Sequence, residues 1–182
     1  PDIYGWRRIP GTEFDFPLVQ RQGDDSFYLT HDSDGNESSA GAIFTESAYN
    51  STTMEDPVTV AYGHQMHAGT MFGKLQETYS QENALEDYGE VIVYLPEKEL
   101  HYQVFAAVPY DNRHILYNYD CTDSRRFNAF LNSIYEVREI GAQFNSGVTV
   151  SIDDKVLVLS TCLAGNSQRR YLVLAVCQAE IE

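Results

Sequence analysis

Hydrophobic positions along the chain fall mainly into short runs of residues that favour strands, separated by polar turns. The runs are rich in Val, Ile, Tyr and Phe, which fit a pleated surface better than a helix. We expect two short strands within 5–20 and further strands in 41–47, 58–64, 91–96, 101–110, 148–152, 155–161 and 169–179. A surface loop with one helical turn near Phe27 is expected in 22–40, and a short helix in 69–79. The pattern indicates a mainly β fold of about eight strands.

The segment 123–141 is the exception, because its apolar residues recur at helical spacing. Phe127, Leu131 and Ile134 lie four and three residues apart, which places them on one face of a helix. Polar residues before them can cap the start of the helix, and Gly141 can cap its end. We expect the longest helix of the chain in this segment.

Composition limits the classes of function that the chain can have. Its 182 residues are 43% hydrophobic, which suits one domain with a sizeable core. A formal charge of −15 disfavours binding to nucleic acids or to an anionic membrane surface. The sequence has no signal peptide and no apolar run long enough to span a bilayer. Because it begins at Pro1, we expect a soluble domain excised from a longer protein.

Three cysteines are present, and Cys162 is the best placed for chemistry. It follows a run of β-forming residues, at the kind of position where a rigid scaffold presents a reactive side chain. By strand alternation, Ser160 and Cys162 point to the same face. Cys177 lies inside an apolar run and Cys121 in a polar loop. A small buried hydrophobe remains the alternative interpretation for any single cysteine.

His64 is the strongest candidate for a general acid and base, because it ends a β run behind Gly63. His67 follows at a spacing that a metal site could use, but no further ligands stand at recognisable spacing. We therefore expect neither a metal nor another cofactor. The other histidines are expected to be solvated: His31, His101 and His114.

Arg169 and Arg170 open the apolar run that follows the cysteine. A guanidinium can donate hydrogen bonds to a carbonyl or to a developing oxyanion, although a surface ion pair is the alternative. Successive strand side chains point to opposite faces, so only one of the two can face Cys162. The hypothesis is a Cys162 nucleophile, a His64 acid/base and one arginine, and spacing alone leaves their convergence open.

These segments occur in the order in which the sortase family carries them. The motifs are "DIYGWRRIPGTEFDFPLVQ", "FYLTHD", "GAIFTES", "VAYGHQM", "GTMFGKL", "VLSTC" and "RRYLVLAV". The chain resembles class B sortases from about Asp2 to Val176, and its 123–141 helix resembles the helical insertion of that class. Gln65 stands where many relatives have Asn, which leaves details of the pocket open.

The resemblance implies a closed eight-stranded sortase-type β-barrel with short helices and one longer helix between strands 6 and 7. It implies that 1–182 is a single sortase catalytic domain, without the N-terminal membrane anchor of the family. The full-length protein would then lie at the extracellular face of the plasma membrane of a Gram-positive bacterium, held there by that anchor.

The resemblance also assigns roles to residues. Cys162 would attack the Thr carbonyl of a C-terminal sorting signal and form a thioacyl intermediate. His64 would protonate the leaving amine and then deprotonate the incoming one. Arg170, which abuts the apolar run, would hold the substrate or the oxyanion, and Ser160 and Thr161 would line the groove. The partners implied are surface proteins that carry the signal and an amine acceptor.

Several functions remain open at this point. The acceptor could be a peptidoglycan precursor, which would anchor proteins to the cell wall, or a pilin lysine, which would polymerise subunits. A hydrolytic cysteine peptidase would use the same nucleophile. A non-catalytic surface β-barrel that binds peptides would not need Cys162 at all.

Overall fold

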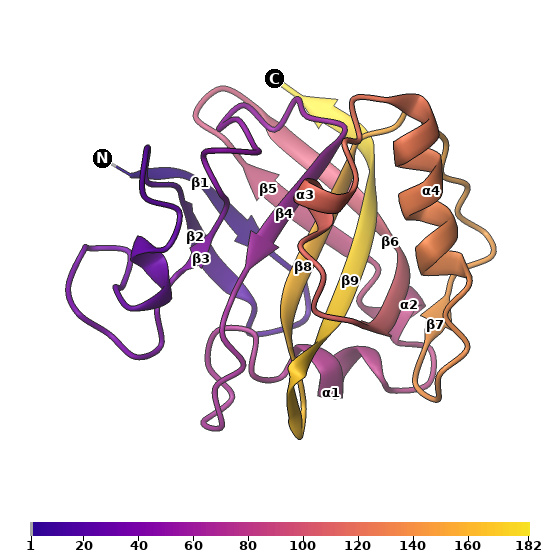
Figure 1. The fold of residues 1–182 in the computed structure, drawn as a ribbon, viewed down its shortest axis with the longest axis horizontal. Coiled ribbons are helices and arrows are strands. Elements are labelled where there is room, and N and C mark those ends of the chain that lie inside the picture. The colour runs from indigo at the N-terminus through magenta and orange to yellow at the C-terminus, as the bar shows by residue number, and fades with distance from the viewer. Residues whose placement is uncertain (1) are drawn as a thin grey trace.

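The computed structural model describes residues 2–182, and its strands form one sheet that closes on itself (Figure 1). The strands are β1 (Ile3–Arg8), β2 (Asp15–Val19), β3 (Ile43–Phe44), β4 (Val58–Tyr62), β5 (Glu90–Tyr94), β6 (Glu99–Tyr110), β7 (Gln143–Phe144), β8 (Val156–Leu163) and β9 (Asn166–Ile181). Their order is β5-β1-β2-β3-β4-β8-β9-β6-β7, and β5 also pairs with β6. That last pairing closes eight strands into a barrel and leaves β7 outside it. The expected closed barrel is confirmed.

The sheet is mixed, and its parallel pairs matter for the position of the site. β2 pairs with β3 and β4 with β8 in parallel, whereas the other pairs are antiparallel. Since β4 and β8 run in the same direction, the segments that follow them leave the barrel at the same end (Figure 1).

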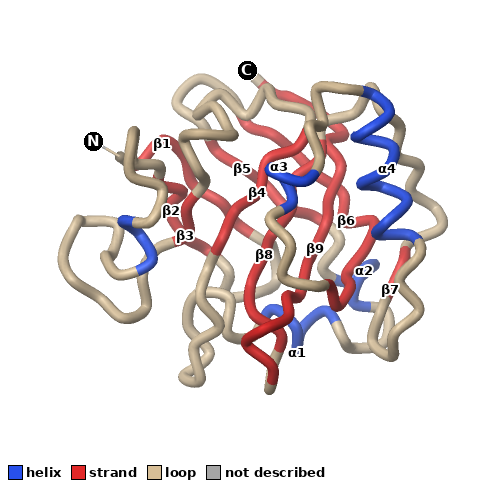
Figure 2. The backbone as a smooth tube through the Cα atoms, in the orientation of Figure 1, coloured by secondary structure: helices blue, strands red, loops and turns tan. Residues whose placement is uncertain are grey.

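The helices are short except for one (Figure 2). They are η1 (Phe27–Leu29), α1 (Leu75–Tyr79), α2 (Ala84–Asp87), α3 (Ile115–Asn118) and α4 (Ser124–Tyr135). α4 lies between β6 and β7, as expected, and the Asp123 carboxylate caps it by accepting from the main-chain N–H groups of Arg125 and Arg126. The helix ends at Tyr135 and does not continue to Gly141, because its buried stripe stops at Ile134.

Two further expectations need correction. The segment 148–152 forms no strand, because its valines pack half-buried beside α4 without a neighbouring strand to pair with. The helix expected over 69–79 begins only at Leu75. The single turns α2 and α3 were not predicted, since one turn is too short to produce a hydrophobic period.

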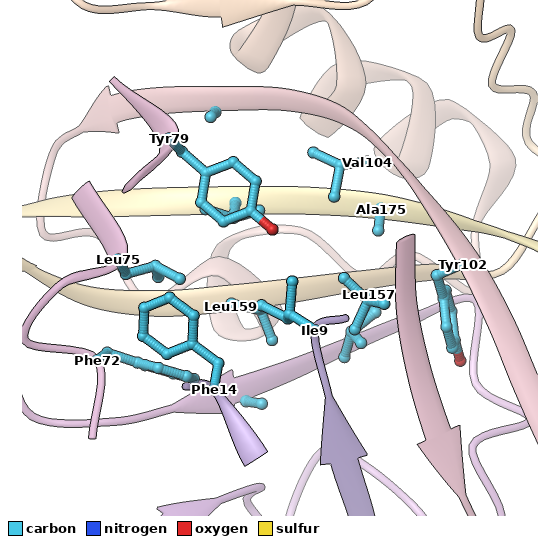
Figure 3. Packing of buried hydrophobic residues seen from close by; sticks show 14 of the residues in the cluster. Ile9, Phe14, Phe72, Leu75, Tyr79, Tyr102, Val104, Leu157, Leu159 and Ala175 are labelled. Atoms are coloured by element: carbon cyan, nitrogen blue, oxygen red, sulfur yellow. The ribbon is translucent and has the colours of Figure 1, made fainter. Parts of the chain in front are cut away.

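Most of the core lies in two clusters, one inside the barrel and one between the sheet and α4, and a small third cluster packs η1 against β2 and β3. β8 and β9 contribute to the two large clusters, because their alternate side chains point inward and outward. The interior part, drawn in Figure 3, includes Leu157, Leu159, Val173 and Ala175, and the outer part includes Val156, Val158, Leu172, Leu174, Phe127 and Phe130. Burial on both faces explains why these strands appear in the sequence as unbroken apolar runs.

Candidate active site

Cys162 lies near the end of β8, opposite Arg170 of β9. The Arg170 Nη1 atom is 3.7 Å from the Cys162 Sγ atom. Nη1 also donates to the main-chain oxygens of Ser167, at 2.9 Å, and Arg169, at 3.1 Å. These bonds hold the guanidinium within the β8–β9 hairpin, against the sulfur.

Arg169 is directed elsewhere. Its Nη1 and Nη2 atoms each lie 2.5 Å from a carboxylate oxygen of Glu139, in the segment after α4. The hydrogen bonds from Arg169 lower the pKa of Glu139. The expectation that only one arginine of the pair faces Cys162 is therefore confirmed, and that arginine is Arg170.

His64 reaches the same end of the barrel from β4. Tyr62 is level with Ser160 in the parallel β4–β8 pair, and the Gly63 N–H donates to the Ser160 oxygen at 3.1 Å. His64 and Cys162 each stand two residues beyond these partners, His64 just past the end of β4 and Cys162 within β8. The His64 Nε2 atom lies 2.7 Å from the Leu29 carbonyl oxygen. Because a carbonyl only accepts, this contact places a proton on Nε2.

The segment after His64 folds back toward the barrel, and its packing requires a glycine at position 63. The Phe72 N–H donates to the His64 oxygen at 3.1 Å, so the chain returns to the barrel at this point. A Cβ atom on Gly63 would lie 2.6 Å from Cδ2 of Phe72, which leaves no room for a side chain. His67 lies in the exposed part of this segment.

Ser160 and Thr161, the predicted groove residues, are both buried, with 4% and 3% of their surface exposed. Ser160 is on the same face of β8 as Cys162, whereas Thr161 points to the barrel interior. Within residues 2–182, the Thr161 Oγ1 atom has no hydrogen-bond partner.

A pocket of about 280 Å³ is lined in part by Leu29, the residue whose carbonyl oxygen contacts His64. It is lined by Asp25, Ser26, Leu29, Phe44, Glu46, Tyr62 and His114. Burial, followed by the charge of Glu46, raises the pKa of Tyr62, and Arg170 opposes this shift. The charges of Glu46, in the pocket, and of Arg170, beside Cys162, thus both influence the pKa of Tyr62.

The remaining histidines are engaged, contrary to the expectation that they are solvated. The His114 Nε2 atom lies 2.7 Å from the Glu46 carboxylate, and His101 lies between Glu90 and Glu99. His31 stacks on Phe27 with 3.9 Å between ring centroids. The His114 pair was missed because its members are far apart in the chain and neither stands in a motif.

Residues 2–182 offer neither a metal-binding cluster nor a membrane-spanning helix. No group of three or more His, Cys, Asp or Glu side chains in this part of the chain could hold a metal ion. No helix in it is long and apolar enough to cross a membrane.

Comparisons with known proteins identify the family. The model of the sortase domain matches residues 8–178, so the chain belongs to the sortase family. It is 28% identical to sortase B of Listeria monocytogenes over 172 aligned residues. The alignment covers 88% of this chain and 63% of that protein. The chain thus spans less than two thirds of this relative.

Two solved structures extend the likeness. A mutant form of Clostridium perfringens sortase B superposes with a TM-score of 0.84 at 25% identity, covering 98% of this chain and 82% of that one. The Staphylococcus aureus sortase B–substrate complex gives a TM-score of 0.80 at 25% identity, covering 97% and 80%. The resemblance to class B sortases is confirmed by sequence and by structure.

Proposed function

We propose that this protein is a class B-like sortase, a cysteine transpeptidase that cleaves a C-terminal sorting signal after Thr and joins it to an amine. The observation that carries the proposal is the 3.7 Å approach of Arg170 Nη1 to Cys162 Sγ, at the end of the barrel where His64 follows β4, the strand parallel to β8. Membership of the sortase family supports it, as does the likeness to a sortase B solved with its substrate.

In the first step, the Cys162 thiol gives its proton to His64 and the sulfur attacks the Thr carbonyl carbon of the sorting signal. A C–S bond forms, the C–N bond breaks, and His64 gives a proton to the leaving amine. Arg170 donates hydrogen bonds to the carbonyl oxygen while it carries negative charge. Because the Leu29 carbonyl engages Nε2 of His64, Nδ1 is the ring atom that exchanges the proton.

The second step transfers the acyl group to an amine. His64 removes a proton from the acceptor, the amine nitrogen attacks the thioester, and the C–S bond breaks to regenerate Cys162. Ser160, on the same face as Cys162, forms the floor of the substrate groove, and Thr161 contributes its main chain there. Residues 1–182 act as one catalytic domain of a protein anchored at the outer face of a Gram-positive plasma membrane.

The acceptor is proposed to be a peptidoglycan precursor, so that the reaction anchors surface proteins to the cell wall. The test is incubation with a small library of sorting-signal peptides and either a peptidoglycan-like amine or a pilin lysine peptide. We expect an acyl-enzyme mass on Cys162 and an amide product with the peptidoglycan-like amine. A product with the lysine peptide alone would identify a pilin polymerase. Hydrolysis alone would identify a peptidase, and the absence of any acyl-enzyme would contradict the enzyme proposal.

A further inference from the structure

A positively charged side chain is enclosed inside the barrel. Arg7, the next-to-last residue of β1, is opposite Phe16 of β2 and Val93 of β5 and is completely buried. Side chains alternate along β1, so that Trp6 and Arg8 are exposed on the outside. Arg7 points inward with Ile9, which belongs to the interior cluster in Figure 3.

Aromatic rings cover the guanidinium, but nothing accepts its hydrogen bonds. The Arg7 Cζ atom lies 4.8 Å from the centroid of the Phe72 ring and 5.9 Å from that of Phe16. Such contacts stabilise the charge through the face of the guanidinium. Its N–H groups lie in the plane of the group, and Nε, Nη1 and Nη2 have no hydrogen-bond partner within residues 2–182.

No nearby carboxylate neutralises this charge. Burial lowers the pKa of Arg7 to about 10, so the group remains charged at neutral pH. Asp15 is the acid close enough to influence it, but that carboxylate is exposed and accepts from the indole N–H of Trp6. A buried charge without a counter-charge is strongly unfavourable, which points to a partner that the chain itself does not provide.

A second donor faces the same interior. The Tyr171 hydroxyl is buried without a hydrogen bond to any residue of the described chain, although Ser80 is near enough to lower the pKa that burial raises to about 12. Arg7 and Tyr171 both influence Tyr79: burial raises the pKa of Tyr79, the charge of Arg7 lowers it, and Tyr171 raises it. Among the described residues, the buried side-chain polar atoms without a hydrogen-bond partner belong to Arg7, Tyr171 and Thr161, and of these side chains only Arg7 is a cation.

We propose that the barrel interior binds one small anion of the halide class at Arg7. A single negative charge compensates the guanidinium, and a monatomic ion accepts from any direction within a closely packed core. Ordered water would satisfy hydrogen bonds but would leave the charge uncompensated. The proposal is independent of the transpeptidase chemistry, because it concerns the inner face of the strands.

A bromide derivative tests the position of the ion. Crystals of the protein soaked in sodium bromide and measured at the bromine absorption edge should show an anomalous peak within hydrogen-bond distance of the Arg7 guanidinium. A water molecule or a protein group alone at this position would overturn the proposal.

Thermal unfolding tests the same site in solution. Bromide is raised at constant ionic strength against gluconate, an anion too large for the interior. The melting temperature of the wild type should rise by roughly 5 °C once bromide reaches about ten times its Kd, and that of Arg7→Met should not respond. Arg8→Met is the matched control, because it removes the neighbouring charge from the outer face, and it should respond like the wild type. An equal response of Arg7→Met, or no response of the wild type, would overturn the proposal. If Arg7→Met does not fold, the bromide peak decides.

Discussion

The two faces of the β4–β8–β9 sheet are built from the same strands but end in different chemistry. On the outer face, valines lead along β4 to His64 and along β8 to Cys162, with Arg170 opposite the cysteine. On the inner face, leucines of β8 lead to Thr161, and the barrel encloses Arg7. Both faces are packed along most of their length, and both carry polar groups at the same end.

The two faces differ in the elements that pack over them. α4 packs in one cluster with Val158 of β8 and Leu172 of β9, whereas Cys162 and Arg170 at the ends of these runs are only half-buried. The barrel closes the inner face on all sides, so a polar group there must find its partner within the fold or in a small enclosed ligand. Alternation along a strand thus lets neighbouring residues serve an open reaction site and a sealed core.

The largest effect should follow from removing the nucleophile on the outer face. Cys162→Ala should lower peptide cleavage by at least about a thousandfold, because no other side chain at this position can form the thioacyl bond. Acyl-enzyme mass and peptide turnover measure this. Thr161→Val, on the inner face of the same strand, should retain most of the activity, as should Cys121→Ser and Cys177→Ala. Full activity in Cys162→Ala would contradict the proposed function.

The next largest effect is expected at His64. His64→Ala should lower turnover by about a hundredfold to ten-thousandfold, the range typical of a lost general acid and base. His67→Ala is the control, because that residue lies in the exposed part of the same segment and should be dispensable. Equal loss in both variants, or inhibition by a chelator, would favour a metal site instead.

The third effect distinguishes Arg170 from Arg169, the two arginines of the hairpin. Arg170→Ala should lower turnover by about a hundredfold, since it removes donors to the developing oxyanion. Arg170→Lys should restore only part of the rate, because an ammonium group cannot reproduce the planar fork. Arg169→Ala loses the ion pair with Glu139 and should keep nearly all activity. Turnover is measured on variants whose fold has been verified. An inactive Arg169→Ala beside an active Arg170→Ala would contradict the assignment of Arg170.

The cover of the outer face can be broken without touching the site. Leu131 is buried in α4 against the sheet, and Leu131→Asp should destabilise the fold by about 3 kcal/mol or more, because it buries an unpaired carboxylate. Thermal unfolding measures this, with the exposed helix residue Asn128→Asp as control. Wild-type stability in Leu131→Asp would mean that the helix is not held by its apolar stripe.

Local periodicity predicted the residues of the outer face. The strand alternation of β8 and β9 is enough to place Ser160 with Cys162 and to separate Arg169 from Arg170. The closed barrel and the position of α4 came from the order of the family motifs. Features that depend on distant partners were not predicted: the Glu46–His114 pair joins segments far apart in the chain, and the segment 148–152 has β-forming residues but no strand beside it.

The burial of Arg7 is the clearest feature that the neighbouring sequence does not predict. Alternation along β1 shows that Arg7 and Arg8 point to opposite faces, but only the closure of the barrel through β5 and β6 determines which face is sealed. An arginine in a strand is normally read as exposed, and no motif marks this one as buried.

The smallest expected effect is a difference in thiol reactivity between Cys121 and Cys162, both on the outer side of the sheet. Cys121 is covered within the outer cluster, and burial raises its pKa to about 12, so at pH 8 only about one such group in ten thousand is a thiolate. Iodoacetamide should therefore label Cys162 in the folded protein and leave Cys121 unmodified over the same time, as peptide mass mapping would show. Because the raised pKa belongs to the folded state, labelling of Cys121 should appear only toward pH 12 or after unfolding in urea, where all three cysteines should react. Equal labelling of Cys121 and Cys162 at pH 8 would mean that the cover over the outer cluster opens as readily as the site itself.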